Sequence, residues 1–311
     1  MKAKTLRIVE VGPRDGLQNE TKIKNLSKEE LVKLRVKFII ALADAGLMDV
    51  EAGAFVRADR IPAMAATDQV LEKIRSERPE LWQSRKFWTL VPNQKGLELA
   101  LKAGAKHISV FTATSDAFNQ KNIQMSVDES LAILKPVVEE AKRHKLGVRG
   151  YVSTVWGCPY SGEVPAYKAL AITEKLLSMG VEEVSLGDTI GVATPKQVDT
   201  VLDLLPKHWP LAVHFHDTRG TAIANCLHAI EHGIHTVDSS AGGLGGCPYA
   251  TGASGNLATE DLLYMLHGMG YQTGVDLQKI CEASKEFSEK LEVVLPSRYF
   301  RAWMGSKLRQ S

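Results

Sequence analysis

The chain has 311 residues, 44% hydrophobic and 24% charged, an ordinary globular mixture that excludes disordered, collagen-like and coiled-coil proteins. Lys and Arg number 38 against 36 Asp and Glu, giving a net charge of +2 without a basic tract, so no nucleic-acid partner is expected. No run of about 18 apolar residues predicts a membrane span. Four widely spaced cysteines without a C-x-x-C pair indicate a reducing compartment, which we take to be the cytoplasm.

Short β-rich runs alternate with helical segments along the whole chain. Strands are predicted at Leu6–Val11, Met48–Ala54, Lys86–Val91, His107–Thr112, Gly147–Ser153, Glu183–Gly187, Leu211–His216 and Thr236–Ser240. Several of them are mostly apolar rather than alternating, which is typical of parallel strands buried on both faces.

Helices are predicted between these strands. Ser27 is a plausible N-cap of the first helix, with Glu30 at the capping-box position. Further helices are expected near Ile61–Ser76, Asn93–Ala103, Ser126–His144, Pro165–Met179, Pro195–Lys207, Thr221–His232 and Thr259–Leu266. Several end in a glycine just before the next strand, as at Ala103-Gly104 and Met179-Gly180, and this recurring cap indicates similar βα units.

Eight consecutive βα units predict a (β/α)8 TIM barrel. A doubly wound sheet is the alternative, but it needs a break in the alternation that the sequence does not contain. We expect a single catalytic domain over residues 1–311, with the barrel at about 5–272 and a helical extension at about 273–305. One or two extra helices are predicted within Val275–Leu291, and the polar residues Ser306–Ser311 are expected to fray.

Polar residues gather where the predicted strands end, which is where active sites of such barrels lie. In strand order they are Arg14 and Asp15 after the first, Glu51 in the second, Asp188 at the end of the sixth, His214 and His216 in the seventh, and Cys247 and Asn256 after the eighth.

The His-x-His pair is the strongest indication of a metal site. Residues two apart on a strand point the same way, so His214 and His216 both face the barrel interior. Asp15 could add a carboxylate from the first strand, and two imidazoles with a carboxylate suit a divalent ion such as Mg, Mn, Co or Zn. The alternative is two histidines packed in the barrel mouth; the position of Asp15 favours the metal.

Arg14 and Cys247 each allow two interpretations. Arg14 could polarise a carbonyl or hold an enolate, or it could form a structural ion pair with Glu51 or Asp188. Cys247 follows a glycine-rich stretch that could close over substrate, and its thiol could act as base or nucleophile if its pKa is lowered. The alternative for Cys247 is a small apolar residue in a turn. The glycine-rich stretch is not a Walker loop, because no Gly-Lys-Ser/Thr follows it.

These motifs resemble the 3-hydroxy-3-methylglutaryl-CoA lyases, a family of metal-dependent TIM-barrel enzymes, over about Leu6 to Leu277. The matching segments are Val9–Glu20, Ser185–Gly191, His214–Thr218, Ala241–Ala250 and Gly252–Asp261. The Arg-Asp-Gly and His-x-His pieces are shared with a wider superfamily of barrel lyases and acyl-transferring synthases, whereas the Cys247 loop is specific to the lyases.

The resemblance implies a role for each candidate residue. Asp15, His214, His216 and Asn256 would hold Mg²⁺ or Mn²⁺. Arg14 would stabilise the thioester enolate, Cys247 would take part in proton transfer from a mobile loop, and Glu51 and Asp188 would be supporting acids. The residue types leave open which of Asp15, Asp188, His216 and Cys247 is the base and which is the acid.

The implied reaction splits 3-hydroxy-3-methylglutaryl-CoA into acetyl-CoA and acetoacetate, as in leucine and ketone-body catabolism, by a homo-oligomer that is a dimer or tetramer. Three alternatives stay open: a lyase for a longer 3-hydroxyglutaryl-CoA, a synthase condensing acetyl-CoA with a 2-oxo acid, and a non-catalytic metal-binding scaffold. After Glu51 the chain reads Ala52-Gly53-Ala54, where the family often has hydroxyl residues, which could alter the fit of the substrate.

Overall fold

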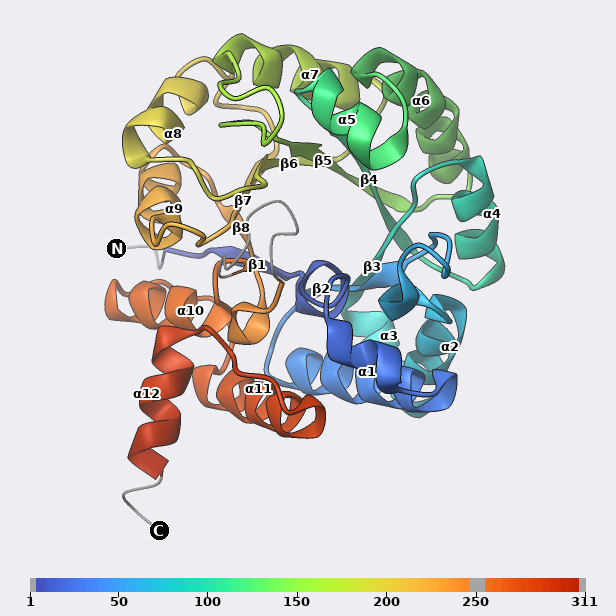
Figure 1. Ribbon diagram of the computed structural model, residues 1–311, viewed down its shortest axis with the longest axis vertical. Helices are drawn as coiled ribbons and strands as arrows, with labels where there is room; N and C mark the ends of the chain where they lie inside the picture. Colours follow the sequence, from blue (N-terminus) through green and yellow to red (C-terminus); the bar gives the residue numbers. More distant parts are fainter. Residues whose placement is uncertain (1–3, 246–254, 308–311) are drawn as a thin grey trace.

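The computed structural model describes residues 4–245 and 255–307. Eight parallel strands form a closed barrel in which each strand pairs with the next and β8 pairs with β1 (Figure 1). The strands are β1 Arg7–Glu10, β2 Asp49–Ala54, β3 Lys86–Leu90, β4 His107–Ala113, β5 Gly147–Ser153, β6 Glu183–Asp188, β7 Leu211–Phe215 and β8 Thr236–Ser239. The predicted TIM barrel is therefore confirmed.

A ring of helices surrounds the strands (Figure 1). The helices are α1 Lys28–Asp44, α2 Thr67–Glu77, α3 Pro79–Ser84, α4 Gln94–Lys102, α5 Asp116–Ile123, α6 Val127–Arg143, α7 Ala166–Ser178, α8 Pro195–Leu202, α9 Ala222–Glu231, α10 Thr259–Gly268, α11 Leu277–Leu291 and α12 Arg298–Lys307. Helix α1 begins as predicted, because the Ser27 hydroxyl accepts from the Glu30 amide and the Glu30 carboxylate accepts from the Ser27 amide. No helix within the described ranges is long and apolar enough to cross a bilayer.

Two helices lie outside the predicted set, and a third belongs to the predicted C-terminal extension. Helices α3 and α5 are single short segments of six and eight residues inside predicted loops. Helix α12 follows α11 in the C-terminal extension and packs on α10 and α11. It runs to Lys307, so the prediction that the chain frays from Ser306 is wrong at its first two residues.

The interior of the barrel is lined by charged side chains rather than by branched apolar ones. Arg149 on β5 reaches Glu183 on β6 and Asp238 on β8 across the barrel. The apolar core lies instead between the strands and the helices, where Val184, Leu186 and neighbouring residues are fully buried. This division leaves polar groups facing the barrel axis at the height of the candidate site.

Candidate active site

A helical turn after β1 presents the first two candidate residues to the end of the barrel. The turn covers Gly12–Gly16 and carries Arg14 and Asp15. Gly16 is required here because a Cβ atom at this position would lie 2.9 Å from the Leu244 Cβ and from the Ser240 Oγ. The close packing of the turn against the segment after β8 thus fixes Arg14 and Asp15 at the rim.

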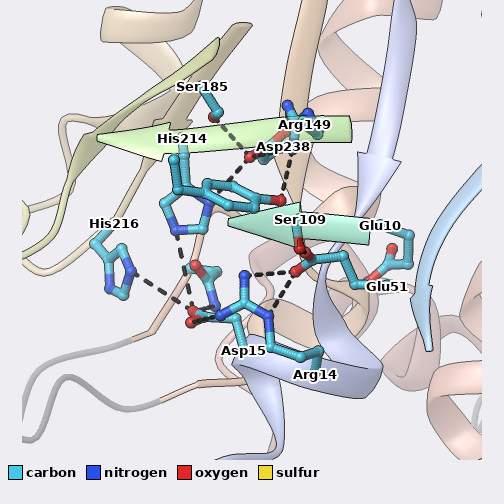
Figure 2. A network of polar contacts seen from close by, with 12 residues as sticks. Glu10, Arg14, Asp15, Glu51, Ser109, Arg149, Ser185, His214, His216 and Asp238 are labelled. Carbon is cyan, nitrogen blue, oxygen red and sulfur yellow. Dashed lines mark hydrogen bonds and ion pairs between the residues drawn. The ribbon is translucent and has the colours of Figure 1, made fainter. Parts of the chain in front are cut away.

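Asp15, His214 and His216 come together as the sequence predicts (Figure 2). The Nε2 atoms of His214 and His216 lie 4.0 and 3.9 Å from the Asp15 Oδ2, and one ligand atom from each residue lies within 4.8 Å of the others. Two imidazoles and a carboxylate at this spacing can surround one divalent ion.

Asn256 joins this cluster from a position far along the chain. Its Nδ2 donates to the Asp15 Oδ2 at 2.9 Å and to the Leu244 carbonyl at 3.0 Å. Its Oδ1 is buried and has no hydrogen-bond partner, and the buried Nδ1 of His216 has none either. Buried acceptors without a donor are costly, and a bound cation would satisfy an amide oxygen of this kind. The residues present therefore fit a metal site.

The orientation of His214 depends on residues that sequence reasoning missed. Its Nδ1 faces the Asp238 Oδ2 at 3.3 Å, which leaves Nε2 for the cluster. Asp238 is in turn held by Arg149 at 2.6 Å and by the Ser185 hydroxyl at 2.8 Å. A carboxylate behind a histidine ligand is the usual way to fix its tautomer and ring orientation. The sequence indicated Asp238 in one way: an aspartate within the predicted buried strand Thr236–Ser240 is unusual and suggests a functional contact.

The pKa values of Asp15 and His216 suit a cation, whereas that of His214 is raised, because the lowering effect of burial is outweighed by Asp238 and Asp15. Burial alone raises the pKa of Asp15, but Arg14, His214 and His216 outweigh it and hold the pKa at about 2. Burial and the neighbouring His214 lower the pKa of His216 to about 4. Near neutral pH the cluster therefore contains an ionised carboxylate and a neutral imidazole, the forms in which these side chains bind metals.

Arg14 lies beside the cluster in a fixed orientation. Its Nε donates to the Glu51 Oε2 at 2.6 Å, and its Nη1 donates to the Asp15 Oδ1 at 2.7 Å. Ser109 donates to the other oxygen of Glu51, and the guanidinium carbon lies 5.3 Å from the centre of the Tyr151 ring. Burial alone lowers the pKa of Arg14, but Glu51 and Asp15 outweigh it and raise it, so the side chain stays charged. Arg14 therefore does form the ion pair with Glu51 that the sequence left open, and its charged guanidinium also lines the cavity.

A cavity of about 710 Å³ opens in front of these residues. The side chains of Arg14, Asp15, His214 and His216 form part of its wall and are at most 13% exposed, so they mark its inner end. The cavity thus gives a small organic molecule access to the cluster.

One candidate, Asp188, is not brought into the cluster. The Asp188 carboxylate accepts from the Val192 and Ala193 amides, each at 3.0 Å, and thereby holds the loop after β6. Asp188 pairs in register with Phe215, which places it on the helix-facing side of the sheet rather than beside the histidines. Burial raises its pKa to about 6 despite the two amides. Cys247 lies outside the described residues.

Fold and site together define a TIM-barrel enzyme whose cavity ends in a candidate metal centre. The model of the HMGL-like family matches residues 5–286, and the chain belongs to this family. This membership confirms the resemblance that the sequence motifs indicated.

Relatives of known identity are similar over nearly their full length. Hydroxymethylglutaryl-CoA lyase of Pseudomonas mevalonii is 45% identical over 296 residues, 94% of this chain and 95% of its own. The crystal structure of the Bacillus subtilis HMG-CoA lyase has a TM-score of 0.90 at 44% identity and covers 98% of this chain and 100% of its own. An Acinetobacter baumannii HMG-CoA lyase in complex with coenzyme A and 3-methylmalate has a TM-score of 0.85 at 32% identity, with coverage of 96% and 95%.

Proposed function

We propose that this protein is a carbon–carbon lyase that cleaves 3-hydroxy-3-methylglutaryl-CoA to acetyl-CoA and acetoacetate. The observation that carries the proposal is the cluster of Asp15, His214, His216 and Asn256 beside Arg14 at the inner end of one cavity. Similarity to hydroxymethylglutaryl-CoA lyases over 94% or more of the chain supports the substrate.

Asp15, His214, His216 and the Asn256 amide oxygen would hold the cofactor, Mg²⁺ or Mn²⁺. When bound, such an ion supplies Lewis acidity that lowers the pKa of a hydroxyl group on the substrate. Asp238 contributes by holding His214 with its Nε2 toward the site.

The reaction transfers a proton, breaks a bond and moves the electron pair onto the thioester. The tertiary hydroxyl proton passes to a base, the C2–C3 bond breaks to give the ketone of acetoacetate, and the electrons enter the thioester as an enolate that is protonated at C2. Arg14 remains cationic and is held by Glu51, so it can stabilise the enolate oxygen without giving up a proton.

The geometry favours some of the four acid–base candidates over the others. Asp15 and His216 line the cavity in their unprotonated forms, with pKa values of about 2 and about 4 that make each a weak base. Asp188 is committed to two backbone amides, which favours a role in shaping the β6 loop. Proton donation to the enolate by Cys247 stays a prediction.

The deciding experiment incubates the purified protein with 3-hydroxy-3-methylglutaryl-CoA and Mg²⁺, with and without a chelator, and measures acetoacetate. Acetoacetate that disappears with the chelator and returns with added metal is the expected result. Folded, metal-loaded protein that releases none would overturn the proposal. A longer 3-hydroxyglutaryl-CoA, and acetyl-CoA with a 2-oxo acid, would then be the next substrates to offer.

Assembly and location remain predictions. We expect a homo-oligomer, dimer or tetramer, which light scattering on the eluting protein would establish. We also expect a cytoplasmic location, although mammalian relatives are named both cytoplasmic and mitochondrial.

A further inference from the structure

A fully buried arginine lies behind the site and takes no part in the reaction chemistry. Arg35 belongs to α1, which packs against both β2 and α2 (Figure 1). Its acceptors among the described residues are the Ala52 carbonyl at 2.8 Å, the Ala65 carbonyl at 2.9 Å and the Thr67 hydroxyl at 3.1 Å, and none is a carboxylate. Burial lowers the pKa of Arg35 to about 10. A buried charge without a counter-charge is costly, so these contacts need an explanation.

The first contact of Arg35 is made at an irregularity in β2. Between Glu51 and Gly53 the pairing of β2 with β3 shifts by one residue, which makes Ala52 the extra residue of a β-bulge. Glu51 reaches Arg14 inside the barrel (Figure 2), and on a regular strand the residue two positions later would point the same way. A Cβ atom on Gly53 would instead lie 2.2 Å from the Arg35 Nη2. The bulge thus turns the strand after Glu51, and the Arg35 guanidinium occupies the space beside Gly53.

The other contacts of Arg35 lie at a second irregularity, where the loop after β2 enters α2. Ala66 has a φ of 54° and a ψ of 33°, a left-handed conformation that is uncommon for a residue with a Cβ atom. Strained backbone of this kind persists only where surrounding contacts hold it in place. Arg35 supplies one such contact on each side of Ala66, to the Ala65 carbonyl and to the Thr67 hydroxyl. The same hydroxyl accepts from the Ala54 amide at 3.3 Å, which ties the start of α2 to the end of β2.

Arg35 therefore joins the two ends of a loop that lines the cavity. The loop covers residues 55–66, and its lining residues are Phe55, Val56, Arg57, Arg60 and Ile61. The bulge before the loop directs Glu51 toward Arg14, and the strained residue at its other end precedes α2. Arg35 itself does not line the cavity, so it can affect the reaction only through the residues that it holds.

We infer that Arg35 is a positioning residue: by binding both the bulge of β2 and the start of α2, it holds the Glu51 carboxylate against Arg14. The inference rests on the proposed function, because Arg14, which Glu51 orients, is the group assigned there to the enolate oxygen. Bulges are frequent beside active sites, where they redirect a side chain. Arginine suits this task because its planar fork donates in fixed directions to acceptors on two segments at once, whereas lysine offers a single nitrogen.

Arg35→Met tests the inference, because methionine keeps an apolar stem and removes every donor. We expect kcat for acetoacetate release to fall about tenfold or more, since a small displacement of an orienting group is enough for a loss of this size. Affinity for Mn²⁺ should change little, because Asp15, His214 and His216 lie on other elements. Arg35→Lys restores one donor nitrogen and should recover part of kcat. The matched control is Lys33→Met, an exposed position on the same helix, which should leave kcat unchanged.

A double variant separates positioning from a loss of stability. Glu51→Gln weakens the hold on Arg14 directly. If Arg35 acts through Glu51, adding Arg35→Met to Glu51→Gln should slow kcat by no more than about twofold, whereas independent effects multiply. Losses that multiply, or a folded Arg35→Met protein whose kcat lies within about twofold of wild type, would overturn the inference. If circular dichroism shows that Arg35→Met does not fold, Thr67→Val removes one acceptor of Arg35 and carries the same comparison, with a smaller loss that Glu51→Gln should also absorb.

Failure of the proposed function gives a different pattern, because wild-type protein would then release no acetoacetate. The position of Arg14 is followed without turnover by ¹⁵N NMR of its Nε–H group, which donates to the Glu51 Oε2 at 2.6 Å. The Arg14→Lys variant identifies this signal by its absence. A signal that shifts or exchanges faster with water in Arg35→Met, and not in Lys33→Met, would support the positioning role of Arg35. A signal that is the same in Arg35→Met as in wild type would overturn it.

Discussion

Two clusters of charged side chains lie inside the barrel, and they differ in how completely their polar atoms are paired. In the deeper cluster Arg149 donates to Asp238 at 2.6 Å, to Glu183 at 2.8 Å and to the Tyr151 hydroxyl at 2.5 Å. The Arg149 side chain is 1% exposed and that of Asp238 is fully buried. None of the buried polar atoms of these four residues lacks a partner.

The cluster at the rim is less complete. Arg14 is paired with Glu51 and Asp15, but the Asn256 Oδ1 and the His216 Nδ1 have no partner. A saturated buried network is rigid, whereas unpaired buried groups need an explanation such as a missing ligand. The rim cluster lines the cavity with Arg14, Asp15, His214 and His216, whereas Arg149 and Asp238 do not line it. The same residue types therefore form a saturated structural network in one cluster and a candidate ligand site in the other.

The two clusters meet at His214, whose Nδ1 contacts Asp238 below and whose Nε2 faces Asp15 above. The saturated network thus holds the Nε2 of His214 toward the proposed metal site. Breaking the upper cluster should cost activity and little stability, and breaking the lower one should cost stability first.

The largest effect on activity is expected for Asp15→Asn, which keeps the shape of the side chain and removes the charge. The metal loses its anionic ligand, and kcat/KM for acetoacetate release should fall by about 1,000-fold or more. The melting temperature should change less than in the deeper cluster, because Arg14 keeps its ion pair with Glu51 when the charge of Asp15 is removed. Activity within tenfold of wild type, with Mn²⁺ still bound in a titration, would contradict the assignment.

The largest effect on stability is expected for Arg149→Met in the deeper cluster. The change leaves the buried carboxylate of Asp238 without its arginine, whereas Glu183 keeps its ion pair with Arg7. Removing one partner of a buried ion pair costs about 3–5 kcal/mol. Urea unfolding measures this loss. Arg143→Met is the control, because Arg143 is 73% exposed and a surface ion pair contributes about 0–1 kcal/mol. Equal losses of unfolding free energy in the two variants would show that the buried ion pairs of Arg149 stabilise the protein no more than a surface ion pair does.

Arg14→Lys tests whether geometry matters beyond charge. Lysine keeps the cation but cannot donate to Glu51 and Asp15 at once in the fixed fork of arginine. We expect kcat to fall about 100-fold, a size typical for loss of one preorganised group at a developing oxyanion, while metal affinity stays close to that of wild type. An unchanged kcat would show that Arg14 acts through its positive charge alone and that the geometry of the guanidinium does not matter.

The sequence was sufficient for the barrel and for the rim cluster because both follow from local rules. Strand alternation set His214 and His216 on the same face, and the position after β1 set Asp15 near them. Asn256 lies far along the chain, and it enters the site through a bridge between its backbone and that of His216. That placement was implied by the resemblance and not by spacing.

Other features of the site could not be predicted from the sequence, because they depend on how strands far apart in the chain are aligned. Asp188 faces away from the cluster because it pairs with Phe215, and that register exists only once β6 and β7 are side by side. The partnership of Arg149 with Asp238 spans the barrel in the same way. Helix α5 was missed because its eight residues, two of them buried, carry too little apolar periodicity to stand out from a loop.

The smallest effect concerns two buried carboxylates that belong to neither cluster. Glu10 accepts from the Gly12 and Ala241 amides, and Glu260 accepts from the Gly242 amide and the Ser284 hydroxyl. No cation faces either one among their hydrogen-bond partners. Burial raises the pKa of Glu10 to about 7 and that of Glu260 to about 8.

The folded protein therefore holds these protons to higher pH than the unfolded chain, whose glutamates titrate near 4.3. Their contribution to stability is fully present below that value and is lost as the pH rises through 7 to 8. We expect Glu260→Gln to remove part of this decline, by about 1–3 kcal/mol between pH 5 and pH 8.5. Melting temperatures across this range measure it, with the exposed Glu289→Gln as control. Parallel curves for Glu260→Gln and wild type would mean that Glu260 is ionised in the folded state, held by its hydrogen bonds as completely as Asp238 is held by Arg149.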